Sequence, residues 1–130
     1  MSARDRNPLR AALLLVIATL SSACGSNTSA CTLEARASVR IQVVDGQGHP
    51  QRDARVTFTR DGGPEQQALC NGSQTRQGNC DAWVTGYESP GEYVLTATSA
   101  DGQRTVTQSV SVGEDACHVQ TRSVTLVLPD

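Results

Sequence analysis

The chain has no lysine and few aromatic residues, which make up only 3% of its 130 residues. Its eleven basic residues are all Arg and face thirteen acidic residues, so the formal net charge is -2. This balance offers no basic surface to a nucleic-acid backbone, and we expect no nucleic-acid partner. Because large aromatic side chains are scarce, the hydrophobic core of a single small domain would need further support.

The start of the chain has the pattern of an export signal. Residues 1–10 carry Arg4, Arg6 and Arg10, and residues 11–20 (AALLLVIATL) contain no charge and no helix breaker. A basic segment followed by a short apolar one is typical of a signal peptide. Ten residues span about 15 Å as a helix, roughly half the hydrocarbon core of a bilayer. We therefore predict a cleaved signal peptide over residues 1–23 rather than a transmembrane helix.

Small residues lead from the apolar segment to a cysteine, in the order Ser21, Ser22, Ala23 and Cys24. The pattern resembles the lipobox of bacterial lipoproteins, which implies cleavage before Cys24 and lipidation of its thiol. It departs from the family at Ser21, where lipoproteins prefer Leu. Ser21 and Ala23 also satisfy the small-x-small rule of ordinary signal peptidase, which would leave Cys24 as a free or paired thiol. We expect the lipid anchor.

The expected location follows from the anchor and from the charge of the mature chain. Cleavage before Cys24 would leave 107 residues with 8 Arg and 12 acidic residues, a formal charge of -4. Surface charge would not hold such a domain on anionic lipid, so the covalent anchor is the expected attachment. The absence of Asp directly after Cys24 resembles lipoproteins of the outer membrane. We expect a lipid-anchored protein there that faces the periplasm or the cell surface.

The mature chain divides into a tether and a folded domain. Residues 24–34 begin with the small and polar segment CGSNTSA, which predicts a flexible tether. Over residues 35–130 apolar and polar residues alternate, as in strands with one buried face. Five segments do so clearly and two weakly, around residues 66–70 and 81–85, and Asp-Gly or Pro-Gly turns separate several of them. The pattern predicts an all-β fold, an Ig-like or transthyretin-like antiparallel β-sandwich of about seven strands.

Four cysteines remain for the folded domain, and they allow three pairings that the sequence alone does not decide. We prefer Cys70–Cys80, which would close a short polar loop, together with Cys31–Cys117. In an Ig-like sandwich the first and last strands often run parallel, and the second pair would then join the segments that precede those two strands. Both disulfides would be expected in an exported protein, and they would support the small core.

Two short motifs carry a family resemblance. They are Val43-x-Asp45-x-x-Gly48-x-Pro50-x-x-x-Ala54-x-Val56 and the later segment from Pro90 to Leu95 (PGEYVL). Together they resemble a carboxypeptidase regulatory-like domain, which implies a transthyretin-like sandwich. The chain departs from this family where many members have a Thr-Asp-x-x-Gly-x-aromatic hairpin, since the Cys70 to Cys80 loop and Trp83 occupy that region. In metallocarboxypeptidases the domain has no catalytic residues, so the resemblance implies no active site.

The polar residues suggest no catalytic or metal site. His49 and His118 are the only histidines, and neither lies in a metal-ligand spacing, so we interpret both as solvent-facing. No Gly-x-Ser-x-Gly elbow is present. The aspartates at turns do not form an EF-hand loop and are expected to hydrogen-bond their own backbone. We expect no enzyme, no cofactor and no bound metal.

Two aromatic residues are candidates for ligand binding. If they are exposed, Trp83 and Tyr87 could stack on a sugar ring, whereas a Trp83 that covers a disulfide would be structural. The sequence predicts a non-enzymatic module of the cell envelope with a structural, adhesive or protein-binding role. The alternative function is binding of a carbohydrate or of peptidoglycan, as an accessory domain of an envelope enzyme or transport system. The partners would be the membrane, through Cys24, and another envelope protein or a glycan.

Overall fold

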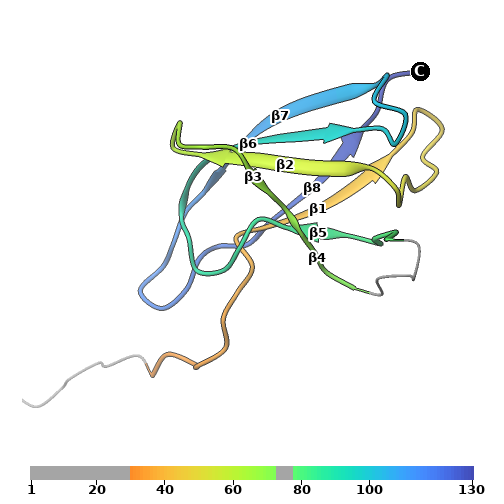
Figure 1. Cartoon of the computed structure of the whole chain (residues 1–130). Helices are drawn as coiled ribbons and strands as arrows, with labels where there is room; N and C mark the ends of the chain where they lie inside the picture. Colours follow the sequence, from red (N-terminus) through yellow and green to blue (C-terminus); the bar gives the residue numbers. More distant parts are fainter. Residues whose placement is uncertain (1–29, 73–77) are drawn as a thin grey trace, which may run out of the picture.

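The computed structural model describes residues 30–72 and 78–130, which form two packed β-sheets (Figure 1). The strands are β1 (Val39–Val44), β2 (Arg55–Arg60), β3 (Gln66–Gln67), β4 (Leu69–Cys70), β5 (Trp83–Val84), β6 (Gly91–Thr98), β7 (Thr105–Val112) and β8 (Arg122–Val127). No helix in the described part of the chain could cross a membrane. The predicted all-β sandwich is confirmed, with eight strands in place of about seven.

The additional strand arises where the chain changes sheets. One sheet has the order β4-β5-β1-β8 and the other β3-β2-β6-β7. The segment expected as a single strand over residues 66–70 is split at Ala68, because β3 pairs with β2 and β4 pairs with β5. This crossing links the two sheets along one side of the sandwich. β7 and β8 are the edge strands on the other side.

One ladder is parallel, and it explains the disulfides. β1 and β8 pair in parallel from Val39 opposite Arg122 to Val44 opposite Val127, while all the other ladders are antiparallel. The segments that precede β1 and β8 therefore lie at the same end of the sandwich. Disulfides join Cys31 to Cys117 and Cys70 to Cys80, with Cα–Cα distances of 5.2 and 5.7 Å. These are the pairs preferred from the sequence.

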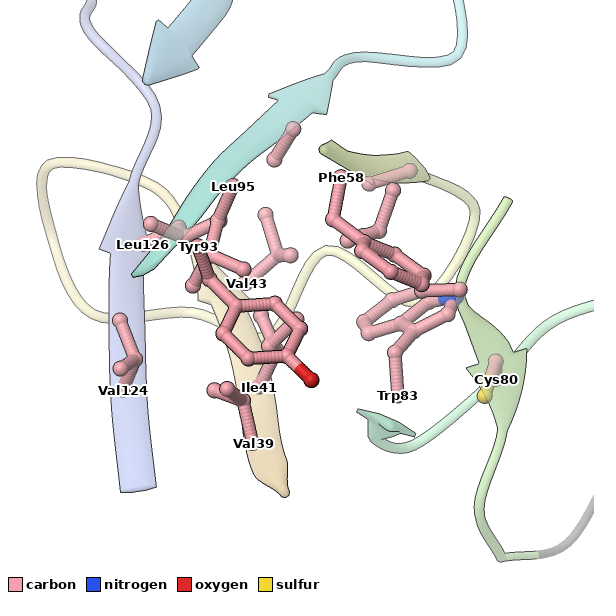
Figure 2. Packing of buried hydrophobic residues seen from close by; sticks show 14 of the residues in the cluster. Val39, Ile41, Val43, Phe58, Cys80, Trp83, Tyr93, Leu95, Val124 and Leu126 are labelled. Atoms are coloured by element: carbon pink, nitrogen blue, oxygen red, sulfur yellow. The ribbon is translucent and has the colours of Figure 1, made fainter. Parts of the chain in front are cut away.

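The core lies between the sheets and is built from the alternating residues of the long strands. On β1, the buried residues Val39, Ile41 and Val43 alternate with exposed Arg40 and Gln42. The facing sheet contributes the aromatic rings of Phe58 and Tyr93, whose centroids lie 5.8 Å apart (Figure 2). The hydroxyl of Tyr93 donates a hydrogen bond of 2.6 Å to the Ser89 carbonyl, so this buried polar group is satisfied.

Candidate functional site

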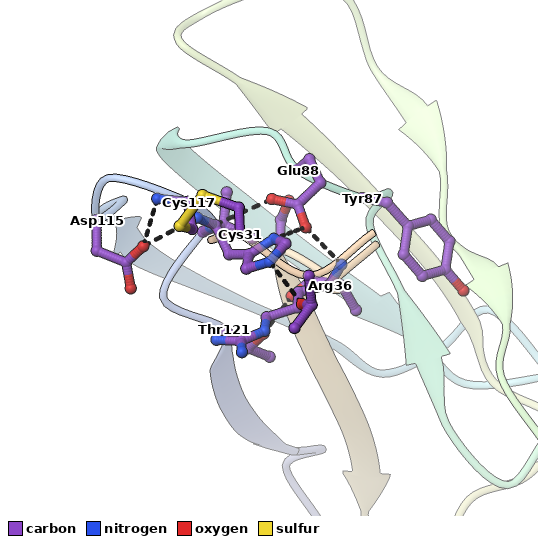
Figure 3. Close-up of polar contacts among 12 residues, drawn as sticks. Cys31, Arg36, Tyr87, Glu88, Asp115, Cys117 and Thr121 are labelled. Carbon is purple, nitrogen blue, oxygen red and sulfur yellow. Dashed lines mark hydrogen bonds and ion pairs between the residues drawn. A yellow bond between two sulfur atoms is a disulfide. The ribbon is translucent and has the colours of Figure 1, made fainter. Parts of the chain in front are cut away.

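The candidate site is a polar cluster at the end of the sandwich where the tether enters. The Cys31–Cys117 disulfide holds the entering chain against the loop that precedes β8. Figure 3 shows the disulfide beside Glu88, from the loop before β6, and Asp115. Three segments that are distant in the sequence therefore meet here. We expected residues 31–34 to belong to the flexible tether. The disulfide shows instead that Cys31 is fixed to the folded domain.

His118 lies at the centre of the cluster and is only 9% exposed. Its Nδ1 atom is 2.8 Å from Glu88 Oε1, and its Nε2 atom is 3.0 Å from the hydroxyl of Thr32. The interpretation of His118 as solvent-facing is therefore wrong, because the entering chain packs beside it and both ring nitrogens have partners. His49, by contrast, has a side chain that is 76% exposed, as expected.

Glu88 is the residue that sequence reasoning missed. Besides His118, it accepts hydrogen bonds from the backbone N–H of Arg36 at 2.7 Å and of Val119 at 3.1 Å. The Arg36 bond is the largest of the effects that hold the pKa of the Glu88 carboxyl below its ordinary value. Its backbone has a φ of 47°, a conformation uncommon for a residue other than glycine. No local sequence signal reveals these contacts, because the partners lie 30 to 52 positions away.

Asp115 organises the loop that carries His118. Its Oδ1 atom accepts hydrogen bonds from the backbone N–H groups of Cys117 at 2.8 Å and His118 at 2.9 Å, and these bonds lower the pKa of its carboxyl. Asp45 and Asp101 accept bonds from nearby backbone N–H groups in the same way, as expected for aspartates at turns. Among the described residues, no three His, Cys, Asp or Glu side chains are grouped as a metal site would require.

The order Thr32–His118–Glu88 places a hydroxyl, an imidazole and a carboxylate in line, as in enzymes with a nucleophilic hydroxyl. The surroundings argue against such chemistry. An open hollow of about 370 Å³ next to the three residues is lined by four carboxylate residues, namely Glu34, Glu88, Glu114 and Asp115. Negative charge there would oppose an oxyanion, which acyl transfer must stabilise. We interpret the three side chains as a clamp that holds the entering chain on the sandwich.

The two aromatic candidates, Trp83 and Tyr87, do not form an exposed platform together. Trp83 is 6% exposed and packs in the core, because its register opposite Ile41 directs the ring inward (Figure 2). Its faces are not available for a sugar ring, and Trp83 is therefore corrected from a candidate ligand contact to a core residue. Tyr87 is 49% exposed at the edge of the polar cluster (Figure 3). It is the only one of the two candidates that a ligand could reach.

A second hollow lies on the outer face of the sheet β4-β5-β1-β8, with a volume of about 330 Å³. The parallel ladder places Arg40 beside Ser123 and Gln42 beside Thr125, and all four side chains are exposed. Asn71 also lines this hollow. The groups gathered here are hydroxyls, amides and one guanidinium, which are donors and acceptors suited to a polar ligand.

Cys24, the expected lipid site, and the signal peptide lie outside the described residues. Comparison with known proteins adds no assignment, because no family model matches the chain and the search of curated proteins found no significant match. The resemblance to a carboxypeptidase regulatory-like domain therefore stays a prediction that rests on the two motifs.

Proposed function

We propose that the chain is a lipid-anchored, non-enzymatic β-sandwich of the cell envelope with a structural, adhesive or protein-binding role. The observation that carries this proposal is the joint at which the tether enters the domain. Cys31 follows Cys24 by seven residues and is covalently bonded to Cys117. Seven extended residues span at most about 25 Å, so a lipid on Cys24 would keep this end of the sandwich close to the bilayer.

The contacts at this joint are suited to an attachment point, because a covalent bond and side-chain hydrogen bonds hold the same segment. Force on the tether would pass through the disulfide to the loop before β8, and the Thr32–His118–Glu88 clamp would hold the same segment. The turn after β1 and the β6–β7 turn lie at the opposite end of the sandwich (Figure 1). An anchored domain would present these turns away from the membrane, where another envelope protein could bind them.

Cell fractionation tests the anchor. The full chain and a Cys24→Ala variant would be expressed in a bacterial host, and membranes would be washed with alkaline carbonate. We expect the unaltered chain in the washed membranes and Cys24→Ala in the soluble periplasmic fraction. Ser26→Ala, two residues further on, serves as the matched control and should stay with the membranes. If Cys24→Ala is retained as well as the control, the lipid anchor is wrong.

A second candidate function is the binding of an envelope glycan, and the hollow on the outer face of the β4-β5-β1-β8 sheet favours it. Gln42 and Thr125 lie side by side there and could exchange hydrogen bonds with sugar hydroxyls. We expect the chain to be retained on insoluble peptidoglycan and Gln42→Ala to lose most of this retention. Gln103→Ala, at an exposed turn, is the control. Equal retention of both variants would exclude the hollow as the binding site.

A further inference from the structure

The side of the sandwich opposite the β3–β4 crossing carries an open edge. β7 pairs only with β6 among the described strands, so the backbone groups along its other side have no strand partner. The strand has eight residues, TVTQSVSV, with no charge, no proline and no glycine. Natural proteins commonly protect such edges with charged residues, proline or bulges, because an open edge can pair with another strand. β7 has none of these protections.

The side chains of β7 also leave the core incompletely covered. Val106 and Val110 pack against the core but are only partly buried, in contrast to the core residues of β6. Gln108 lies between them on the same face of the strand and is exposed. The opposite face carries only hydroxyl residues, namely Thr105, Thr107, Ser109 and Ser111. An added strand could therefore cover two valines and pair with a row of hydroxyls.

We propose that β7 is a dimerisation edge, at which a second copy of this chain pairs its own β7 in antiparallel orientation about a two-fold axis. With Gln108 opposite its own copy, Val106 faces Val110 of the other copy, and Thr107 faces Ser109. Valine thus faces valine, hydroxyl residues face hydroxyl residues, and the amide of Gln108 faces its own copy, which favours this register. A shift by one pair would place Gln108 opposite Val110, so that the half-buried Val110 would lose its apolar neighbour, while Val106 would face Val112, which the core already covers.

The charges that flank the strand are complementary for antiparallel pairing of two copies, in this register and in the one shifted toward Val112, so the match of the two half-buried valines selects the register. Arg104 precedes β7 and Glu114, which is bridged to Val119, follows it by two residues, so a pairing that extends past both ends of the strand would bring Arg104 of one copy diagonal to Glu114 of the other. Diagonal neighbours lie about 7–8 Å apart, within reach of long side chains. The pairing would join the β3-β2-β6-β7 sheets of the two copies into one sheet of eight strands. The β7 edge of each copy would then be paired. The proposal is independent of the proposed function.

Cysteine cross-linking in the full chain, expressed in bacterial envelopes, tests the register. Opposite residues of an antiparallel pair have Cα atoms about 4.5–5.5 Å apart, which suits a disulfide. We expect most of the Gln108→Cys variant to run as a dimer on a non-reducing gel. Ser109→Cys would be offset from its own copy by about 7–8 Å and should stay monomeric. Gln103→Cys controls for random collision. If Gln108→Cys gives no more dimer than Gln103→Cys, or less than Ser109→Cys, the proposed pairing is overturned.

A charge exchange at the same exposed position gives a second test that does not depend on added thiols. Two differently tagged copies would be co-expressed and purified through one tag from a detergent-treated lysate of whole cells, so that the result does not depend on the lipid anchor. Like charges that face each other across the axis should weaken pairing about fivefold. When both copies carry Gln108→Lys, about five times less of the second copy should therefore co-purify with the first. Gln108→Lys with Gln108→Glu should recover as well as the unaltered pair. Equal recovery in all combinations, or none for the unaltered chain, would overturn the dimer.

Discussion

The two disulfides should contribute unequally to stability, because they close loops of very different length. The cysteines of Cys31–Cys117 are 86 residues apart, and those of Cys70–Cys80 are 10 apart. The loss of unfolded-chain entropy then corresponds to about 4.6 kcal/mol for the long loop and about 2.7 kcal/mol for the short one. Cys80 is also 3% exposed within the core, and its replacement by Ala adds about 1 kcal/mol of lost packing. The expected difference in unfolding free energy is about 1 kcal/mol.

Urea unfolding of the two double-alanine variants measures this difference. Trp83 is the single tryptophan and is 6% exposed, so its fluorescence reports the loss of the core. We expect Cys31→Ala/Cys117→Ala to unfold at a lower urea concentration than Cys70→Ala/Cys80→Ala, with similar slopes. An equal midpoint, or a higher one, would refute the loop-entropy argument and would mean that the joint at the tether adds little to the stability of the sandwich.

Three further changes test the local contacts through the unfolding free energy. Tyr93→Phe should cost about 1 kcal/mol, because the buried bond to the Ser89 carbonyl is lost; no change would mean that water replaces it. Gly91→Ala should cost more than Gly102→Ala, because its φ is 145° and the added Cβ would lie 2.7 Å from Asp61 Oδ1, whereas at Gly102 it would meet nothing within 4 Å. The lowered pKa values of Glu88 and Asp115 give stability that is present above their ordinary values of 4.5 and 3.8 and is lost as the pH falls through the folded values. In Glu88→Gln the unfolding free energy should therefore fall less between pH 6 and pH 3 than in the unaltered chain. An unchanged dependence of the unfolding free energy on pH would contradict this.

Much of the fold could be predicted from the sequence because alternation is a local property. The buried residues of β1, β2, β6 and β8 follow from period two alone. The split of residues 66–70 could not be predicted in this way, since a strand that changes sheets keeps the same alternation while its partners change. The burial of Trp83 likewise depends on its register opposite Ile41, which lies 42 positions away.

The candidate site was predicted only in part. The Cys31–Cys117 pair follows from the expectation that the first and last strands run parallel, and β1 and β8 do so. The contacts of Glu88 and His118 require three loops to meet, and only the folded chain brings them together. Two isolated polar residues in a sequence carry no signal that they will be hydrogen-bonded to each other when their separation is 30 positions.

The most direct test of the proposed lipid anchor is the mass of the N-terminal peptide of the mature protein, purified from bacterial membranes. Our account predicts a peptide that begins at Cys24 and carries a diacylglyceryl group on its thiol. A peptide that begins at Cys24 with an unmodified thiol would contradict the anchor, and so would a chain that retains residues 1–23.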